Sequence, residues 1–392
     1  MTGVKKYRLS DLINVKHGFA FKGEYFSDEP TNDILLSPGN FKIGGGFKSD
    51  KFKYYNGEFP KDYILKEGDI LITMTDLSKA GDTLGYSAKI PPHNGINYLH
   101  NQRLGLVQFK NDEIDPDFLY WILRTQPYQY YIVGSATGST VKHTSPTRIC
   151  SYEFEAPIDK KKQQEIAQIL TSLDDKIELN LQMNQTLEAM AQALFKEWFV
   201  NFNFPNFDGE LENDLPKGWR MGKVGEILQP KRGRNITKAE AIEGVFPVVA
   251  GGLEPSCYHN ESNTKEPVIT ISSSGANAGF VRLYQMPVWS ADSCFIDSSI
   301  FPFVHYIYIF LKSNQKNIYD SQEGSAQPHI YPRHIMDLNI CVGNESVVKQ
   351  FEEIVTPLFE KIKYNALQIQ TLTHTRDTLL PKLMSGKLEI KK

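Results

Sequence analysis

Two stretches of the chain carry apolar residues at alternating steps of three and four, which places them along one side of an α-helix. The first stretch runs from Asp159 to about Trp198, and its seam positions are Leu170, Leu173, Ile177, Asn180, Asn184, Leu187, Ala191, Leu194 and Trp198. The second runs from Asn344 to about Leu383, with the seam Val355, Leu358, Ile362, Asn365, Ile369, Leu372, Arg376, Leu379 and Leu383. Each begins at a good N-cap, Asp159 or Asn344. The pattern predicts two long helices that pack on each other along a heptad seam.

The two stretches match at a constant offset of 185 residues, so the chain contains an internal repeat. Asn180 and Asn365 occupy the same repeat position. A buried Asn on such a seam fixes register or orientation at some cost in stability. The alternative, which the sequence leaves open, is that both amides face solvent at the edge of the seam.

Each predicted helix follows a globular segment of mixed type. Short apolar runs at 69–74 and 267–271 predict strands, glycine-rich turns punctuate them, and the aromatic run 118–124 predicts a short helix. Both segments end in a similar passage, Gly138 to Pro146 in the first and Gly324 to Pro332 in the second. The predicted organisation is a first domain at 1–157, a helix at 158–200, a linker at 201–216, a second domain at 217–342, and a helix with the C-terminal tail at 343–392.

The order domain, helix, domain, helix fixes the direction of the helices. The end of the first helix and the start of the second are both tied to the second domain, so the helices should run antiparallel as a coiled coil. The predicted fold is therefore α+β, with two mixed α/β domains separated by two long antiparallel helices in a pseudo-two-fold repeat. Two domains held ~30 to 60 Å apart would span about one to two turns of B-DNA.

Composition agrees with a two-domain protein. The 392 residues are 41% hydrophobic and 23% charged, enough to bury cores. No apolar run reaches the ~20 residues that cross a membrane, and the first residues lack the apolar core of a secretory signal, so we expect a cytoplasmic protein. The four cysteines, Cys150, Cys257, Cys294 and Cys341, are too scattered for a disulfide framework or a zinc site.

Charge and motifs narrow the function. The net charge of -3 argues against a purely electrostatic nucleic-acid binder, unless basic residues gather on one face or a partner supplies part of the phosphate grip. The chain has no phosphate-binding GxxxxGK[ST] motif, no GxGxxG opening a helix, no HExxH and no paired CxxC. We interpret Asp174 and Asp175 as a solvated helix face. We expect no catalytic residues, no metal and no cofactor.

The chain resembles the specificity subunits of type I restriction-modification systems over its whole length. Besides the repeat and the two Gly-Ser passages, the resemblance rests on short segments in a specific order, namely EGDILI at 67–72, QQEIAQIL at 163–170, LFKEWF at 194–199 and LPKLMSGKLEI at 380–390. The resemblance implies a DNA-binding subunit in host defence and DNA methylation. Each domain would be a target-recognition domain that reads half of a bipartite asymmetric site. The helices would set the spacing and recruit two methyltransferase subunits and, for cleavage, motor-nuclease subunits. S-adenosylmethionine and ATP would bind to those partners only.

Candidate DNA contacts are basic, amide and hydroxyl side chains in turns and at strand ends, because these groups bind phosphates and base edges. In the first domain they are Lys48, Lys51, Lys53, Tyr54, Thr75, Lys79, Asn101, Gln102, Arg103, Ser139, Thr140, Lys142 and His143. In the second domain they are Lys231, Arg232, Arg234, Asn235, Ser273, Ser274, Asn277, Ser325, Gln327, His329 and Arg333. The run from Lys231 to Arg234 is the strongest candidate, since it places three cations in four residues.

Each group also has a plainer interpretation. Lysine clusters are usually solvated, serine-glycine turns usually only turn, and histidines are more often structural than base-reading. For the whole chain, the alternatives to a DNA-binding subunit are a scaffold that does not touch DNA and an enzyme with an unrecognised site.

Overall fold

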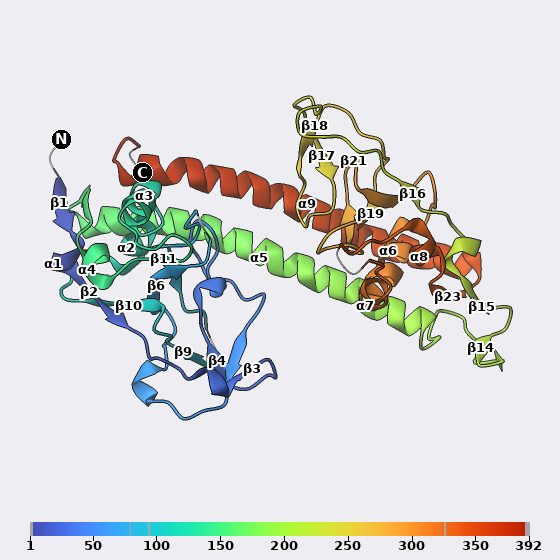
Figure 1. Ribbon diagram of the computed structural model, residues 1–392, viewed down its shortest axis with the longest axis horizontal. Coiled ribbons are helices and arrows are strands. Elements are labelled where there is room, and N and C mark those ends of the chain that lie inside the picture. The colour runs from blue at the N-terminus through green and yellow to red at the C-terminus, as the bar shows by residue number, and fades with distance from the viewer. Residues whose placement is uncertain (1–2, 79, 93–94, 325–326, 389–392) are drawn as a thin grey trace. The chain divides into compact units, whose positions relative to one another are not determined.

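The computed structural model describes residues 3–78, 80–92, 95–324 and 327–388, and the chain divides into two compact units. Unit 1 comprises residues 1–177 and 370–392, and unit 2 comprises residues 178–369. Figure 1 labels the elements of both units.

Unit 1 contains two four-stranded sheets and two strand pairs. The first sheet has the order β2-β10-β6-β8 and is antiparallel throughout, with β2 Ile13–His17, β10 Leu104–Phe109, β6 Ile70–Thr73 and β8 Ser87–Lys89. The second has the order β3-β5-β4-β9, with β3 Phe26–Ser27, β5 Lys53–Tyr55, β4 Asp33–Leu35 and β9 Asn97–Leu99. β1 (Val4–Arg8) pairs with β12 (Glu153–Pro157), and β7 (Thr75–Asp76) pairs with β11 (Lys142–His143).

The described residues of the globular part of unit 1 also form the helices α1 Leu9–Leu12, α2 Pro116–Ile122, α3 Gln126–Gly134 and α4 Pro146–Cys150. α2 confirms the helix predicted from the aromatic run. Its N-cap is Asp115, whose carboxylate accepts from the amides of Asp117 and Phe118, and Pro116 suits the first turn because it lacks the amide hydrogen. The helix then buries five consecutive residues from Phe118 to Ile122 in the core.

Unit 2 has a four-stranded sheet, a three-stranded sheet and two strand pairs. The four-stranded sheet has the order β16-β22-β19-β20, with β16 Lys231–Arg232, β22 Ser293–Asp297, β19 Val268–Ser272 and β20 Val281–Tyr284. The three-stranded sheet has the order β18-β17-β21, with β18 Cys257–His259, β17 Phe246–Val249 and β21 Trp289–Ser290. β15 (Arg220–Lys223) pairs with β23 (Asn339–Val342), and β13 (Leu211–Glu212) pairs with β14 (Leu215–Pro216).

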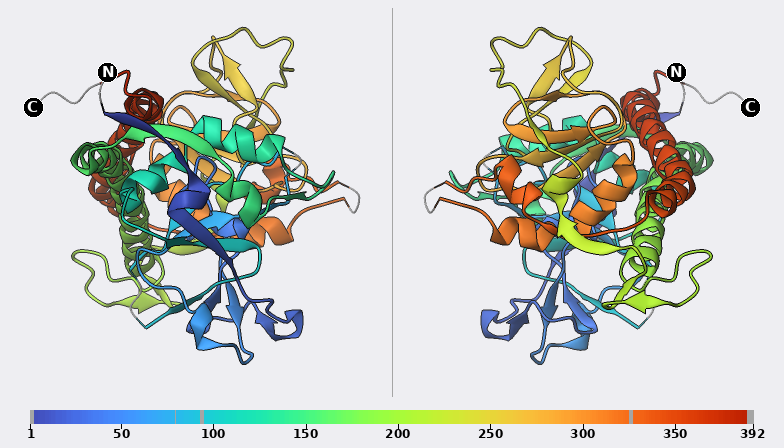
Figure 2. Two further views of the ribbon diagram at one scale, coloured as in Figure 1. Left: turned by 90° about the vertical axis from the view of Figure 1, so that its left-hand side faces the viewer. Right: turned by 90° about the vertical axis from the view of Figure 1, so that its right-hand side faces the viewer.

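The helices of the globular part of unit 2 are α6 Val304–Ser313, α7 Gln315–Asp320 and α8 Pro332–Met336. α6 is buried from Val304 to Leu311. Figure 2 shows the β17–β18 arm, in yellow, extending away from these orange helices. Single 3-10 turns lie at Gly23–Tyr25, Pro38–Asn40, Lys61–Tyr63 and Val224–Glu226.

The two units share a strand arrangement. In each four-stranded sheet the strand that contains the apolar run, β6 or β19, lies third, between an antiparallel neighbour on either side. In each second sheet a central strand, β4 or β17, pairs antiparallel on one side and parallel on the other. The apolar runs at 69–74 and 267–271 therefore occupy the same place in the four-stranded sheets of the two units.

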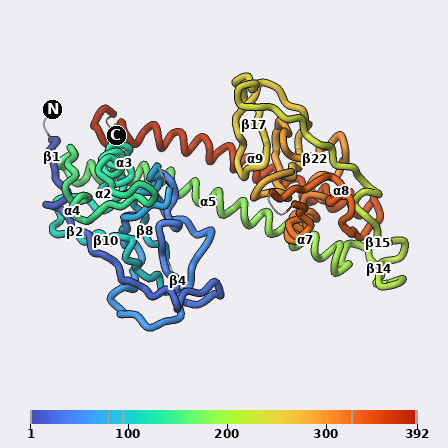
Figure 3. The backbone as a smooth tube through the Cα atoms, viewed as in Figure 1, coloured from blue at the N-terminus to red at the C-terminus, as the bar shows by residue number. Residues whose placement is uncertain are grey.

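The two remaining helices, α5 (Lys160–Phe199) and α9 (Glu345–Met384), have 40 residues each. Figure 3 traces α5 in green and α9 in red. Both predicted N-caps are confirmed, because Asp159 Oδ1 accepts from the Lys161 amide at 2.9 Å and Asn344 Oδ1 accepts from the Ser346 amide at 3.0 Å. All predicted seam positions on both helices are buried or half-buried.

Both seam asparagines are buried, which answers the question that the sequence left open. Asn180 and Asn365 are 1% and 0% exposed, so the solvent-facing alternative is wrong. Within unit 2, Asn180 Nδ2 donates to Gln368 Oε1 at 3.1 Å and Asn365 Nδ2 donates to Asn184 Oδ1 at 2.8 Å. Later positions on α5 thus meet earlier positions on α9, so the helices run antiparallel there.

The segment predicted as a linker, 201–216, is more structured than its composition indicated. It contains the β13–β14 pair, and the Phe204 ring stacks on Trp219 with a centroid distance of 4.9 Å. Asn and Pro content favours turns, but the aromatic residues anchor those turns to the core of unit 2. No helix in the described part of the chain has both the length and the apolar character needed to cross a membrane.

Candidate nucleic-acid interface

A closed loop from Thr137 to His143 presents polar side chains in unit 1. Two backbone hydrogen bonds join its ends, from the Thr137 amide to the His143 carbonyl at 3.0 Å and in the reverse direction at 2.8 Å. Gly138 has a φ of +97°, and a Cβ there would lie 2.0 Å from the Val141 carbonyl oxygen, so the tight path requires glycine. The hydroxyls of Ser139 and Thr140 are exposed at the tip.

This loop rests on the end of the central strand. β7 continues the line of β6, and its Thr75 pairs with His143 while its Asp76 pairs with Lys142. Thr75 is 7% exposed, and its Oγ1 lies 3.3 Å from His143 Nδ1. Thr75 therefore positions the loop, and its side chain does not face solvent.

Asp76 shapes the neighbouring turn. Its carboxylate accepts from the backbone amides of Ser78 and Thr83 and from the Thr83 hydroxyl. Burial alone would raise the pKa of Asp76, but these hydrogen bonds outweigh burial and lower the pKa below its ordinary value. Asp76 was not among the residues predicted from the sequence, although an Asp two residues before a Ser is a typical turn signal.

A third segment lies beside the strand end. The Asn101–Arg103 turn is closed by a hydrogen bond from the Leu104 amide to the Asn101 carbonyl at 2.9 Å. The Met74 amide donates to the Arg103 carbonyl at 2.9 Å, and the Met74 carbonyl accepts from the Thr144 amide at 3.0 Å. Met74 thus links the Asn101–Arg103 turn and the end of the 137–143 loop at one strand end. Gln102 and Arg103 are exposed, and Asn101 is half-buried.

His100 braces that turn. It is 1% exposed, and its Nε2 donates to the Leu104 carbonyl at 2.9 Å. Burial lowers the pKa of His100 to about 4, so the ring is neutral at physiological pH.

The basic-aromatic stretch belongs to the other sheet of unit 1. Asn40, which is 2% exposed, donates from Nδ2 to the carbonyls of Lys48 and Lys51 at 3.3 and 3.0 Å, so it fixes the backbone beneath the lysines. Lys51 and Lys53 are exposed, Lys48 is half-buried, and Lys48 Nζ lies 3.2 Å from the Asp50 carboxylate. Tyr54 is half-buried against the core beneath β5.

Unit 2 repeats the closed loop at Glu323–His329. The Glu323 amide donates to the His329 carbonyl at 3.1 Å and the reverse bond is 2.8 Å. Gly324 has a φ of +95°, and a Cβ there would lie 2.6 Å from the Gln327 carbonyl oxygen. Ser274 bridges to His329 as Thr75 does to His143. Gln327 is exposed, and His329, Ser274 and Asn277 are half-buried.

Charged groups secure the base of this second loop. The Glu323 carboxylate pairs with Arg333, and it accepts from His334 Nε2 at 3.0 Å. The hydrogen bond from His334, followed by the charge of Arg333, lowers the pKa of Glu323. The Arg333 guanidinium also lies 4.8 Å from the centre of the Tyr331 ring. The exposed Arg333 therefore has part of its charge balanced within the protein.

The run from Lys231 to Asn235 follows the edge of the unit 2 sheet. Lys231 and Arg232 form β16 against β22. A Cβ at Gly233 would lie 2.4 Å from the Ser290 carbonyl oxygen, so glycine lets the strand pass close to β21. Trp289 Nε1 donates to the Arg234 carbonyl at 2.7 Å. Lys231, Arg232, Arg234 and Asn235 are exposed, and none of the ion pairs among the described residues involves the three cations.

The structure narrows the predicted set. Ser273 is 5% exposed, and its carbonyl accepts from the Ile330 amide, so Ser273, like Thr75, supports a loop rather than facing solvent. Lys79 and Ser325 lie outside the described residues. Contact with DNA stays a prediction for the other described candidates, both exposed and half-buried.

The interpretation of Asp174 as a solvated side chain is wrong. Its carboxylate lies between the guanidinium groups of Arg124 and Arg376, with the Arg124 Nη1 at 2.7 Å from Oδ2. Burial alone would raise the pKa of Asp174, but the two guanidinium groups outweigh burial and lower the pKa below its ordinary value. The adjacent Asp175 is exposed, as expected, and the sequence offers no difference between the two aspartates.

Comparisons with known proteins agree on one family. The family model of the type I restriction modification DNA specificity domain matches residues 1–189 and 216–374. The type I restriction enzyme MjaIX specificity subunit of Methanocaldococcus jannaschii is 31% identical, over 88% of this chain and 91% of its own length. The HindI specificity subunit of Haemophilus influenzae is 25% identical, over 79% of this chain and 87% of its own length.

A solved structure shares the fold. The type I restriction-modification S subunit from M. genitalium superposes with a TM-score of 0.62 over 99% of this chain and 97% of its own, at 20% identity.

Proposed function

We propose that this chain, which belongs to the type I restriction-modification DNA specificity family, is the subunit that recognises DNA for a restriction-modification complex. Each globular part, within 1–157 and 217–342, reads one half of a bipartite asymmetric site. The chain itself catalyses no reaction, and it works in the cytoplasm, where the DNA is.

The observation that carries the proposal is the matched frame of the two loops. Thr137–His143 and Glu323–His329 are closed by the same pair of backbone hydrogen bonds, and both rest on a strand end. The side chains carried by the two loops differ, since Val141 and Lys142 of unit 1 correspond to Gln327 and Pro328 of unit 2. The same frame with different side chains suits two readers of different base sequences.

The strongest proposed contacts with DNA phosphates lie in unit 2. The run Lys231–Arg234 offers exposed cations on a sheet edge, which would release counterions on binding DNA. Because the net charge of the chain is -3, its long-range electrostatic field adds little to the attraction for DNA. We therefore propose that the complex binds DNA more tightly than the chain does alone, because its partners contribute further phosphate contacts.

We assign the spacer role to α5 and α9. A continuous 40-residue helix is ~60 Å long at ~1.5 Å per residue, and the buried Asn layer would fix how the two helices align as an antiparallel coiled coil in a pseudo-two-fold repeat. The same helices would recruit two methyltransferase subunits and, for cleavage, motor-nuclease subunits. S-adenosylmethionine and ATP chemistry would belong to those partners.

The experiment that tests this function is selection on random duplexes. The complex with its methyltransferase subunits is incubated with the pool, and the retained duplexes are sequenced. We expect an asymmetric bipartite motif with a fixed unspecified gap. A continuous or palindromic motif contradicts the proposal, and so does catalytic turnover by the purified chain.

Charge reversal separates DNA binding from a scaffold role. In the variant K231E/R232E/R234E, repulsion from phosphate should lower retention on DNA and reduce the slope of log K against log salt by up to about 3. The control K160E/K161E/K162E makes the same change in charge at the start of α5 and should bind as the unaltered chain does. Unchanged retention in the first variant would favour the scaffold.

A further inference from the structure

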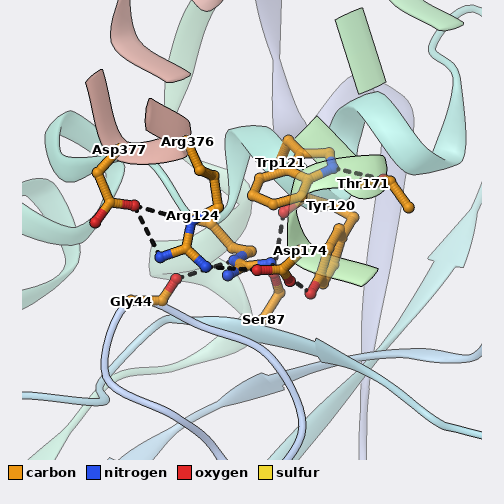
Figure 4. Close-up of polar contacts among 9 residues, drawn as sticks. All are labelled: Gly44, Ser87, Tyr120, Trp121, Arg124, Thr171, Asp174, Arg376 and Asp377. Atoms are coloured by element: carbon orange, nitrogen blue, oxygen red, sulfur yellow. Dashed lines mark hydrogen bonds and ion pairs between the residues drawn. The ribbon is translucent and has the colours of Figure 1, made fainter. Parts of the chain in front are cut away.

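The strongest unexplained feature outside the loops is the buried ionic cluster of Arg124, Asp174 and Arg376. Arg124 follows α2 in the globular part of unit 1, Asp174 lies on α5, and Arg376 lies on α9. Arg124 is 5% exposed, and the side chain of Arg376 is 16% exposed. Figure 4 shows the contacts of the Asp174 carboxylate with both guanidinium groups. Three separate elements therefore meet at one carboxylate.

Arg124 makes more contacts than an ion pair requires. Its Nη1 donates to Asp174 Oδ2 at 2.7 Å and to the Tyr120 hydroxyl at 2.8 Å. Its guanidinium carbon lies 4.2 Å from the centre of the Trp121 ring, whose Nε1 donates to Thr171 on α5 at 3.0 Å. These contacts hold the guanidinium in one orientation.

A third hydrogen bond of Arg124 reaches the turn Gly44–Gly46. Its Nε donates to the Gly44 carbonyl at 2.9 Å. All three glycines have positive φ, and a Cβ at Gly45 would lie 2.7 Å from Arg124 Cγ, so the turn closes directly over the arginine. The Gly46 amide donates to the Ser87 carbonyl at 2.8 Å, and Ser87 Oγ donates to the Tyr120 carbonyl at 3.0 Å.

This turn leads directly into the basic stretch Lys48–Lys53. The Lys42 amide donates to the Gly46 carbonyl at 2.9 Å, and the Lys48 amide donates to the Asn40 carbonyl at 2.8 Å. The Asn40 side chain further restricts that backbone, because its Nδ2 donates to the Lys48 and Lys51 carbonyls. Hydrogen bonds thus hold the Gly44–Gly46 turn to Arg124 and hold the lysine backbone to Asn40, and the short chain segment between them joins the two.

We propose that Arg124 and Asp174 are positioning residues that fix the Gly44–Gly46 turn, and with it the Lys48–Lys53 stretch, on the helices α5 and α9. The inference rests on the proposed function, because the stretch acts on DNA only if unit 1 is a reader. Arg376 supplies the second charge that keeps Asp174 ionised and in place. Base reading by unit 1 then depends on a cluster that itself touches no base.

The test uses hydrogen exchange and duplex selection together. Arg124→Met removes all three hydrogen bonds and leaves Asp174 paired with Arg376. Asp174→Asn replaces the carboxylate that α5 contributes to the cluster with a neutral amide. In the full chain, exchange of the amides in 41–53 should become about tenfold faster in both variants, the effect of losing a hydrogen bond to a charged group, while β10 amides keep their rates. The control Asp175→Asn makes the same substitution one residue along on α5 and should leave both rates unchanged.

In duplex selection by the complex, both variants should lose sequence preference in the half-site that unit 1 reads and keep the other half-site. Unchanged exchange in 41–53, or a motif with both halves intact, overturns the proposal. If Arg124→Met does not fold, Gly45→Ala disturbs the turn from the loop side and must give the same two results. If the unaltered complex selects no bipartite motif, the proposed function fails, and the exchange rates still decide whether Arg124 holds the turn.

Discussion

At the scale of single residues, buried polar groups in this protein position exposed ones. His100, Thr75 and Asn40 are each less than a tenth exposed, and each holds a segment that presents candidate DNA contacts. A polar group buried without a partner is costly, so such residues persist where their hydrogen bonds fix a backbone path. Because His100 is titratable, its contribution can be measured through the pH dependence of the free energy of unfolding.

Replacing His100 by Gln should flatten the acid dependence of stability. The folded pKa of His100 is about 4, against 6.5 for the ordinary side chain, so between these values the unfolded chain binds a proton that the folded chain does not. The free energy of unfolding should therefore fall by about 1.4 kcal/mol per pH unit below pH 6.5 on account of this residue. Urea unfolding of H100Q between pH 4 and 7 should lack that part of the slope.

The control for this measurement is H374Q, which replaces an exposed histidine on α9. It should keep the slope of the unaltered chain. An H100Q protein with the same slope as H374Q would show that His100 takes up its proton in the folded state.

At the scale of elements, the closed loops depend on glycine. In Gly138→Ala, a Cβ would lie 2.0 Å from the Val141 carbonyl oxygen, so the loop should open, and the complex should lose preference in the unit 1 half-site only. Duplex selection measures this. Gly134→Ala is the matched control, because a Cβ there meets no heavy atom within 4 Å. Equal loss of both half-sites would show general unfolding instead.

The buried asparagines of α5 and α9 should cost stability. The Asn365 side chain is fully buried, and its Oδ1 has no hydrogen-bond partner among the described residues. Asn365→Leu should therefore raise the free energy of unfolding by about 1 kcal/mol, measured by urea denaturation. The exposed position Gln370→Leu on the same helix should change it little. A loss of stability in N365L would mean that the amide contributes more to packing than its unpaired carbonyl costs.

At the scale of the whole molecule, recognition should be modular. If each globular part reads its own half-site, replacing 217–342 with the matching segment of a relative should change one half of the target and leave the other. Methylation mapping of the complex with the hybrid chain would reveal this. Changes in both halves would show that the two readers are coupled.

The repeat and the seam were determined by sequence alone, because helix periodicity and capping are local properties. Alternating steps of three and four predicted α5 and α9, and Asp159 and Asn344 predicted their first turns. Short apolar runs predicted β6 and β19, and the aromatic run 118–124 predicted α2. The exposed cations of Lys231–Arg234 could also be recognised, since charge density is visible without coordinates.

Only the tertiary structure decided which polar residues face solvent and which support the fold. Thr75 and Ser273 are strand-end residues whose burial comes from loops more than fifty residues away in sequence, and no local pattern records that distance. Asp174 looks like Asp175 in the sequence, yet Arg124 and Arg376 surround it because three distant segments meet there. Periodicity states which side of a helix is apolar, but the partner of a buried charge depends on where the rest of the chain folds.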